Sequence, residues 1–306
     1  MKRQVNNSWP NREVIIVQKR ERGWIVLFLL PTILLFLLFF AIPLVMVFGQ
    51  SLFDYRLMPK TFKFVGVGNY VKLFTADRAF WPTMKNTILW ILIHCIGHVF
   101  IGSLLAFILY KRPFGWKFVR VVYMIPNIIS QSAIAMIFLN IYNPQYGALN
   151  AFFKSLGLES LTHNWLFEVD TAYPAVTMTW FLFAGYTTTL VLAQCLSTDE
   201  TLIEAARVDG ANSFQVDTLI MFPMVKEMIG TTTIMAATYM LQMFSMIYIT
   251  TNGGPGMTTM NLPLYLYSNM KANNYGYAST VGVVIIIVGF VTMRIINKIF
   301  GMNKEE

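Results

Sequence analysis

Charged side chains are scarce in this chain of 306 residues: Asp, Glu, Lys and Arg together account for 12% of the sequence, and hydrophobic residues for 56%. A soluble domain usually carries about 25% charged residues. The scarcity is concentrated in six blocks without any charged residue, which are Gly23–Phe53, Asn86–Tyr110, Val121–Phe153, Thr171–Thr198, Met228–Met270 and Ala272–Met293. Runs of this length exclude a soluble protein and indicate one that lies in a membrane.

Each block is long enough to cross a bilayer, because a hydrocarbon core of about 30 Å requires roughly 20 helical residues. The predicted fold class is an all-α membrane protein whose transmembrane domain covers 23–300, between a tail at 1–22 and another at 301–306. The apolar centres of the blocks predict six membrane-spanning helices, near 24–48, 86–110, 118–141, 172–196, 227–250 and 277–299. The third span contains Pro126, Asn127, Ser130 and Gln131, whose polar groups must face other helices rather than lipid.

The basic residues predict the orientation of the chain. If the N-terminus lies in the cytoplasm, 15 of the 23 Lys and Arg residues fall in cytoplasmic segments, among them the short basic turn at 111–117. The positive-inside rule therefore favours two cytoplasmic termini. The net charge of +8 fits residues that lie beside anionic lipid headgroups. We expect membrane lipids as partners and no nucleic acid, since no zinc-finger spacing or basic–aromatic stripe is present.

Signatures of catalysis are missing, because the sequence has no G-x-x-x-x-G-K-[ST], G-x-S-x-G, H-E-x-x-H or C-x-x-C pattern. Cys95 and Cys195 fall in different spans, which favours two small buried residues over a disulfide. His94 and His98 share a helix face, but without a third ligand nearby they favour a hydrogen-bonded helix contact over a metal site. We therefore expect no enzyme, no metal and no cofactor bound by this chain.

A polar segment at 197–225 separates the fourth predicted span from the fifth. Ser197 and Glu200 have the spacing of a capping box at the start of a helix. The residues from 202 to 207 favour helix by their propensity. Gly210 stands where this helix would end in a left-handed conformation.

A second short helix is predicted to follow at Ser213–Met221. Asn212 and Gln215 can cap its start, and Pro223 is expected to end it before the fifth span begins. The segment 197–225 is thus predicted to form a helix–turn–helix across the cytoplasmic face.

The same segment matches the pattern EAA-x3-G-x9-I-x-x-P, in which Phe222 stands where leucine is usual. It resembles the EAA loop of permease subunits in binding-protein-dependent ABC importers, which docks onto a separate ATPase. The small Ala205 and Ala206 would permit close approach, and the Glu204 carboxylate could pair with a basic group of a partner. The resemblance implies an ATPase-coupling role for Glu204, Ala205, Ala206, Asp209, Gly210, Ile220 and Pro223.

Other segments resemble the sugar-transporting class of these permeases, in particular Thr250–Pro255 and Tyr275–Ala278, within a likeness that covers roughly 22–300. The resemblance implies the fold of a type I importer permease with cytoplasmic coupling helices, of the kind that serves maltose or glycerol-phosphate importers as the first of two permeases. The implied solute is an oligosaccharide or related glycoside. The implied partners in a bacterial inner membrane are a second permease, two ATPase subunits that bind ATP and Mg, and an extracytoplasmic sugar-binding protein.

In this family the sugar pocket lies between the fourth and fifth spans, where the present sequence has two stripes of aromatic and polar residues at helical spacing. Aromatic faces suit sugar C–H surfaces, and hydroxyl or amide groups suit sugar hydroxyls. Contact between helices is the alternative interpretation of such stripes. The predicted substrate-path residues are Thr179, Phe183 and Tyr186 in the fourth span, and Tyr239, Gln242 and Met243 in the fifth.

Three alternative functions are open at this point. An ABC permease for peptides or phosphonates would keep the EAA pattern but not the sugar-type segments. A secondary carrier would usually need more spans, internal repeats and acidic residues within the membrane, and the six blocks contain no Asp or Glu. A structural scaffold in the membrane would not need the EAA pattern.

Overall fold

The computed structural model describes residues 11–302, with side chains from Trp24 onward. The backbone is already helical at Asn11, so the first helix begins inside the segment predicted as a tail at 1–22. The rest of that predicted tail, and residues 303–306 of the second one, lie outside the described residues.

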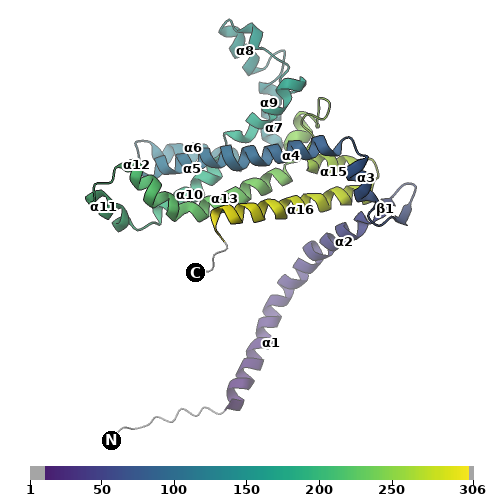
Figure 1. The fold of residues 1–306 in the computed structure, drawn as a ribbon, viewed down its shortest axis with the longest axis horizontal. Coiled ribbons are helices and arrows are strands. Elements are labelled where there is room, and N and C mark those ends of the chain that lie inside the picture. Colours follow the sequence, from purple (N-terminus) through teal and green to yellow (C-terminus); the bar gives the residue numbers. More distant parts are fainter. Residues whose placement is uncertain (1–10, 303–306) are drawn as a thin grey trace.

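The first part of the chain is a long helix followed by a small hairpin. In order, its elements are α1 (Asn11–Phe36), the π-helical turn η1 (Leu37–Ala41), α2 (Ile42–Ser51), β1 (Phe53–Arg56), β2 (Thr61–Phe64) and α3 (Gly68–Thr75). The strands are antiparallel, and Phe53 is paired with Phe64. α1, η1 and α2 together form the long helix. Its first part, α1, leads away from the remaining helices, while its last part, α2, packs on α16 (Figure 1).

The rest of the chain forms an elongated helix bundle and an arm that projects from it (Figure 1). The arm carries α8, and the helices α4, α5, α13 and α16 run along the bundle. In order, the elements are α4 (Phe80–Ile93), η2 (His94–His98), α5 (Val99–Tyr110), α6 (Trp116–Ile128), α7 (Gln131–Ile141), α8 (Ala148–Ser155), the 3-10 turn η3 (Glu159–Leu161), α9 (Val169–Phe181), α10 (Gly185–Leu196), α11 (Glu200–Val208), α12 (Ser213–Gln215), η4 (Val216–Met221), α13 (Phe222–Gln242), α14 (Ser245–Thr250), α15 (Leu262–Lys271) and α16 (Tyr275–Phe300).

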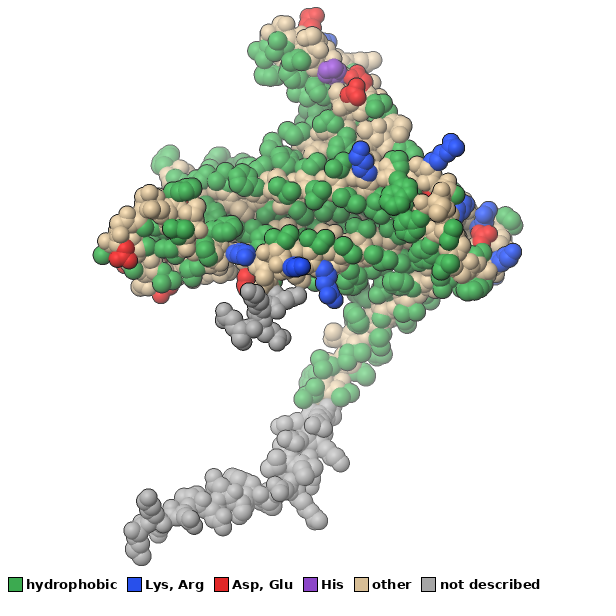
Figure 2. All heavy atoms as spheres, in the orientation of Figure 1, with side chains coloured by type: hydrophobic (Ala, Val, Ile, Leu, Met, Phe, Trp, Pro, Cys, Tyr) green, Lys and Arg blue, Asp and Glu red, His purple; other side chains and the backbone are tan. Residues whose placement is uncertain are grey.

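Within the described residues, several helices are long and apolar enough to cross a membrane. Hydrophobic side chains cover much of the visible face of the bundle (Figure 2), as expected for a surface that faces lipid rather than water. The spans formed without a sharp bend are Trp24–Ser51, Phe80–Tyr110, Val169–Leu196, Ser213–Thr250 and Tyr275–Phe300. A bent pair of helices, Trp116–Ile128 and Gln131–Ile141, makes a sixth when the two are counted as one span.

The bent pair corrects the prediction of one straight helix near 118–141. α6 and α7 meet at an angle of 98°, because Ile129 and Ser130 are extended rather than helical. The Ser130 hydroxyl accepts a hydrogen bond from the backbone N–H of Ala133 at 3.3 Å and so caps a new helix. The polar residues noted in this span therefore mark a break in the helix.

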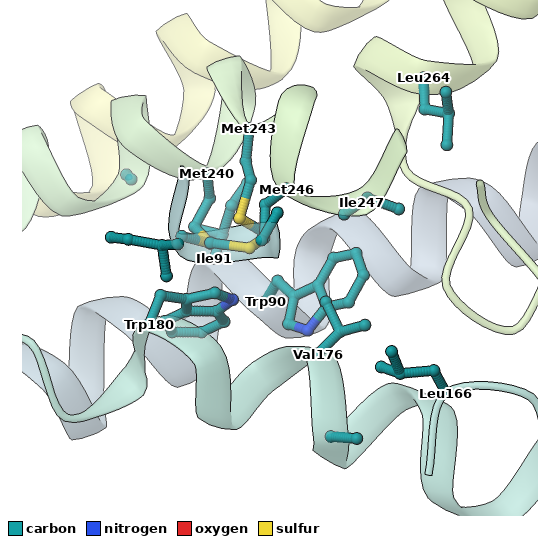
Figure 3. Packing of buried hydrophobic residues seen from close by; sticks show 14 of the residues in the cluster. Trp90, Ile91, Leu166, Val176, Trp180, Met240, Met243, Met246, Ile247 and Leu264 are labelled. Atoms are coloured by element: carbon teal, nitrogen blue, oxygen red, sulfur yellow. The ribbon is translucent and has the colours of Figure 1, made fainter. Parts of the chain in front are cut away.

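A buried apolar cluster lies where α4, α9, α13 and α14 meet (Figure 3). Trp90 and Trp180 pack there against methionines of α13 and α14, whose flexible side chains fill irregular space. The Trp90 indole N–H donates to the Thr177 hydroxyl at 2.8 Å, which satisfies a buried polar group. The cluster holds the central part of the bundle together.

Asp77 lies in the loop between α3 and α4 and connects this loop to α15 and α16, at the end of the bundle that carries β1. Its carboxylate accepts hydrogen bonds from the Tyr265 hydroxyl of α15 and, at 2.5 Å, from the Tyr277 hydroxyl of α16. Burial alone would raise the pKa of Asp77, but these hydrogen bonds and those from the backbone outweigh it and hold the pKa below its usual value. The contact therefore favours an ionised Asp77 in the folded chain.

The close approach of α6 and α10 depends on Gly185. A Cβ atom at this position would lie 2.0 Å from the carbonyl oxygen of Tyr123, which is backbone and cannot move alone. We expect Gly185→Ala to lower stability by about 1–3 kcal/mol through overpacking, measured as a fall in the unfolding temperature of the detergent-solubilised protein. Gly49→Ala is the matched control, since a Cβ there meets nothing within 4 Å. An unchanged unfolding temperature for Gly185→Ala would contradict this close packing.

Candidate functional site

The segment 197–225, called the coupling segment below, begins with α11. The helix starts at Glu200 because the Asp199 carboxylate accepts a hydrogen bond from the Thr201 N–H at 3.0 Å. Hydrogen bonds from Thr201 also hold the pKa of Asp199 below its usual value. The capping box predicted for Ser197 and Glu200 was wrong, since the Ser197 hydroxyl instead donates to the carbonyl of Gln194 at 2.8 Å.

The end of α11 has the predicted left-handed glycine. Gly210 has φ +86°, and its N–H donates to the Arg207 carbonyl at 3.0 Å. The next N–H, that of Ala211, donates to the Ala206 carbonyl at 2.9 Å. These two bonds form a Schellman motif, which satisfies the last carbonyls of the helix and turns the chain back.

The second helix of the coupling segment starts as predicted but does not end as predicted. Asn212 and Gln215 form a reciprocal capping box, with bonds of 2.9 and 2.8 Å. The chain then passes from α12 through the π-helical η4 into α13 without a break, so Pro223 does not end this helix. Pro223 lies in the first turn of α13, directly after η4. The wider π turn accommodates a residue that lacks an N–H and would clash with a regular helical turn.

The coupling segment presents a mixed apolar and acidic surface. Val208, Phe214 and Leu219 are 87, 74 and 71% exposed, which is unusual for apolar side chains in water and typical of a surface that contacts a partner. Ile203 and Val216 are buried beneath this surface and anchor it to the bundle. Of the predicted coupling residues, Glu204, Ala205, Asp209, Gly210 and Pro223 are exposed, and Ala206 and Ile220 are half-buried.

Asp217 ties the coupling segment to the end of α5. Its carboxylate accepts from the Tyr110 hydroxyl at 3.1 Å and pairs with the Lys111 ammonium at 2.5 Å. The contact joins residues more than 100 positions apart in the chain, so no local sequence pattern indicated it. It links the second helix of the coupling segment to the second span.

A cavity of about 370 Å³ lies within the bundle, between the second, third, fourth and fifth spans. Its lining combines aromatic rings with hydroxyl, amide and imidazole groups. Four of the six predicted substrate-path residues lie in this lining, namely Thr179, Phe183, Tyr186 and Tyr239.

The other two predicted path residues lie elsewhere. Gln242 is exposed and Met243 is buried in the apolar cluster beside Met240 and Met246 (Figure 3). The reason is that α13 ends at Gln242 and Met243 adopts an extended conformation, with φ −70° and ψ 99°. The predicted stripe assumed that the helix continues through Met243, but the helix ends one residue earlier.

The lining also contains polar residues that the stripes did not include. The His94 Nδ1 atom hydrogen bonds to the Ala236 carbonyl at 2.9 Å, and the His98 Nδ1 atom to the Phe181 carbonyl at 3.2 Å. These are contacts between helices, as expected from the spacing of the two residues. Among the described residues no group of three His, Cys, Asp or Glu side chains could hold a metal ion. The lining further includes Asn127, Gln131, Trp180, Thr187 and Thr232.

Comparison with known proteins assigns the chain to a class. Residues 98–302 match the family described as binding-protein-dependent transport system inner membrane component. The chain is 36% identical over 284 residues to the probable ABC transporter permease protein YurN of Bacillus subtilis, covering 92% of this chain and 97% of that protein. It is 31% identical over 271 residues to the sulfoquinovosyl glycerol transport system permease protein SmoG of Agrobacterium fabrum, covering 86% of each. The chain belongs to this family of inner-membrane transport components.

The fold is shared with a chain in the crystal structure of a bacterial alginate ABC transporter in complex with an alginate pentasaccharide-bound periplasmic protein. The TM-score is 0.78 at 23% identity, over 92% of this chain and 95% of that one. The predicted all-α permease fold is thereby confirmed. Membership of the family makes the chain a multi-pass membrane subunit of an ATP-driven, binding-protein-dependent transporter, and not an enzyme.

Proposed function

We propose that this chain forms, together with a second and similar permease, the membrane path for a sugar, either an oligosaccharide or a glycoside. The observation that carries the proposal is the cavity, because its aromatic rings and neutral polar groups suit the C–H faces and hydroxyls of a sugar. The relative SmoG, named for the transport of sulfoquinovosyl glycerol, a sulfonated glycoside, supports glycosides in general as the solute class. An extracytoplasmic binding protein delivers the sugar, and two separate ATPase subunits supply the energy.

The helical run from Ser213 to Gln242, which comprises α12, η4 and α13, provides a mechanical link between the two sites. One end carries the exposed Phe214 of the coupling segment, and Tyr239 near the other end lines the cavity. When the ATPase subunits bind ATP and Mg and close, they draw the coupling segments of the two permeases together. Movement of this helical run then opens the cavity toward the binding protein, which is alternating access between two global states.

A ligand screen on the complete system tests the proposed solute. The complex of both permeases, the ATPase and the binding protein is purified, and thermal shift of the binding protein is measured with panels of sugars, peptides and phosphonates. We expect stabilisation by sugars, followed by uptake of the same sugars in proteoliposomes. Stabilisation and uptake of peptides or phosphonates instead would replace the sugar assignment with the corresponding alternative.

The orientation is part of the proposal, with both termini and the coupling segment in the cytoplasm of a bacterial cell and the segments 50–85, 142–170 and 251–276 outside. Tyr146 and Ser213 are both exposed on the protein surface, so only the side of the membrane decides whether a cysteine there reacts. We expect an impermeant thiol reagent to label Tyr146→Cys, but not Ser213→Cys, in intact cells. The native Cys95 and Cys195 are partly or fully buried and give little background. After the cells are opened, Ser213→Cys should become reactive, whereas labelling of it from outside would reverse the orientation.

A further inference from the structure

We infer that the half of the path formed by this chain binds an uncharged sugar through two neighbouring hydroxyl donors, which the imidazoles of His94 and His98 accept. The same arrangement selects against carboxylated and sulfonated sugars. This inference rests on the proposed function and specifies its substrate class.

The two imidazoles lie next to each other on one helical turn. They bound the π-helical segment η2, a type of turn that occurs often at functional sites. Their ring centroids are 4.0 Å apart with 54° between the planes, and both rings line the cavity. Their spacing allows both to reach adjacent hydroxyls of one sugar ring.

The hydrogen bonds of the two Nδ1 atoms determine whether the imidazoles can donate or accept a hydrogen bond in the cavity. A backbone carbonyl oxygen can only accept, so the Nδ1 atom of each histidine carries the proton that it donates to Ala236 or to Phe181. A neutral imidazole that donates from Nδ1 leaves Nε2 as an acceptor. The pair therefore presents two acceptors, which require donors such as O–H groups.

Trp180 is a hydrogen-bond donor next to the two imidazoles. The residue lines the cavity, and its ring is nearly perpendicular to the His94 ring at 4.9 Å between centroids. The residue is only 3% exposed, and its indole N–H has no hydrogen-bond partner among the described residues. A buried donor without a partner is rare in native proteins, but the indole nitrogen has less than 1 Å² of accessible surface, so a sugar oxygen would reach it only after the ring moves.

The charge of the lining determines the selectivity. Among the described residues, the side chains that line the cavity include no Asp, Glu, Lys or Arg. A carboxylate or sulfonate that entered would lose its water without gaining a cation, and its oxygens would face two nitrogen acceptors. A neutral diol instead offers two hydroxyl donors, which can pair with the two imidazole acceptors.

The test uses variants that remove the acceptors and keep the helix contacts. In His94→Asn and His98→Asn, the amide N–H₂ can replace the Nδ1 donor, but nothing replaces Nε2. Cys95→Ala is the matched control, since Cys95 lies between the histidines and does not line the cavity. The probes are maltose, cellobiose, lactose and trehalose and their glucuronyl counterparts, each first measured for binding to the binding protein and then for uptake by the complete complex.

We expect wild type and Cys95→Ala to import the neutral probes with at least tenfold higher kcat/KM than the uronates. Each asparagine variant should lose about tenfold in kcat/KM for the neutral probe, and the double variant about 100-fold, from the loss of one and two hydrogen bonds. The ratio of kcat/KM for the neutral probe to kcat/KM for the uronate should fall by a similar factor in these variants. If the double variant does not assemble, the wild-type preference alone remains decisive.

Equal or preferred import of uronates by the wild-type complex would overturn this inference and leave sugar import standing. Unchanged kinetics in an assembled double variant would overturn it as well. Failure of the proposed function would look different, because neither neutral nor acidic sugars would enter while a solute of another class did.

Discussion

Replacement of Gly210 by valine should abolish sugar uptake and sugar-stimulated ATPase activity, although Gly210 cannot touch the solute. Its φ of +86° is strained for a residue with a side chain, at a cost of roughly 1–2 kcal/mol and more for a β-branched one. A Cβ atom at Gly210 would meet nothing within 4 Å, so the effect arises from the backbone and not from a clash. The turn that aligns α11 with the second helix would be lost, and with it the surface that we propose contacts the ATPase.

Gly210→Asn is the matched control, because asparagine tolerates the left-handed conformation. It should keep most of the uptake and ATPase association. The measurement is copurification of the ATPase together with ATP turnover and uptake in proteoliposomes. Full activity of Gly210→Val, or equal loss in both variants, would show that the Schellman turn has no part in coupling.

Charge reversal at Glu204 tests the same surface by a different route. Glu204 is exposed on α11, and Glu204→Lys would place a positive charge where a basic group of the ATPase is expected, replacing attraction by repulsion. Glu227→Lys makes the same change at an exposed position beyond the coupling segment and should have a smaller effect. Normal ATPase association in Glu204→Lys would exclude Glu204 from the interface.

The second large effect is expected in the cavity. Tyr186→Ala and Tyr239→Ala should each reduce kcat/KM for the transported sugar about tenfold while the complex still assembles. Both rings line the cavity, and loss of one stacking contact should cost roughly 0.5–1.5 kcal/mol beyond the lost area. Tyr239 also packs near the His94 ring, at 5.4 Å between centroids, so its removal loosens the polar part of the lining.

Tyr248→Ala is the control for loss of an aromatic ring. Tyr248 lies on α14, outside the cavity lining, and stacks on Phe244. It should leave the apparent KM unchanged. If Tyr186→Ala and Tyr239→Ala transported with wild-type kinetics, the cavity would not be the sugar path.

Most of the spans, the capping box of Asn212 and the turn at Gly210 could be predicted from the sequence because their causes are local. Lipid requires long apolar runs, and the capping box of Asn212 and Gln215 and the turn at Gly210 depend on a few adjacent residues. The EAA pattern is likewise contiguous. The amino-acid sequence alone is therefore sufficient to predict the turn at Gly210 and the start of the second helix.

Features that depend on distant contacts or on a local change of helix type could not be predicted. The predicted stripe in the fifth span did not extend to Met243 because the helix ends at Gln242. The helix expected to end at Pro223 continues instead, because a π-helical turn precedes this proline. The spacing of His94 and His98 was visible, but the carbonyls that accept their protons lie on other spans. The pairing of Lys111 with Asp217 is similarly a consequence of packing.

Solute uptake into proteoliposomes that contain the complete complex tests the central claim most directly, namely that this chain is a path opened by a separate ATPase. Parallel vesicles lack ATP, the ATPase or the binding protein. We expect sugar uptake only when all three are present, with ATP hydrolysis rising when the loaded binding protein is added. Uptake by the two permeases without ATP, driven by an imposed proton gradient, would contradict the claim.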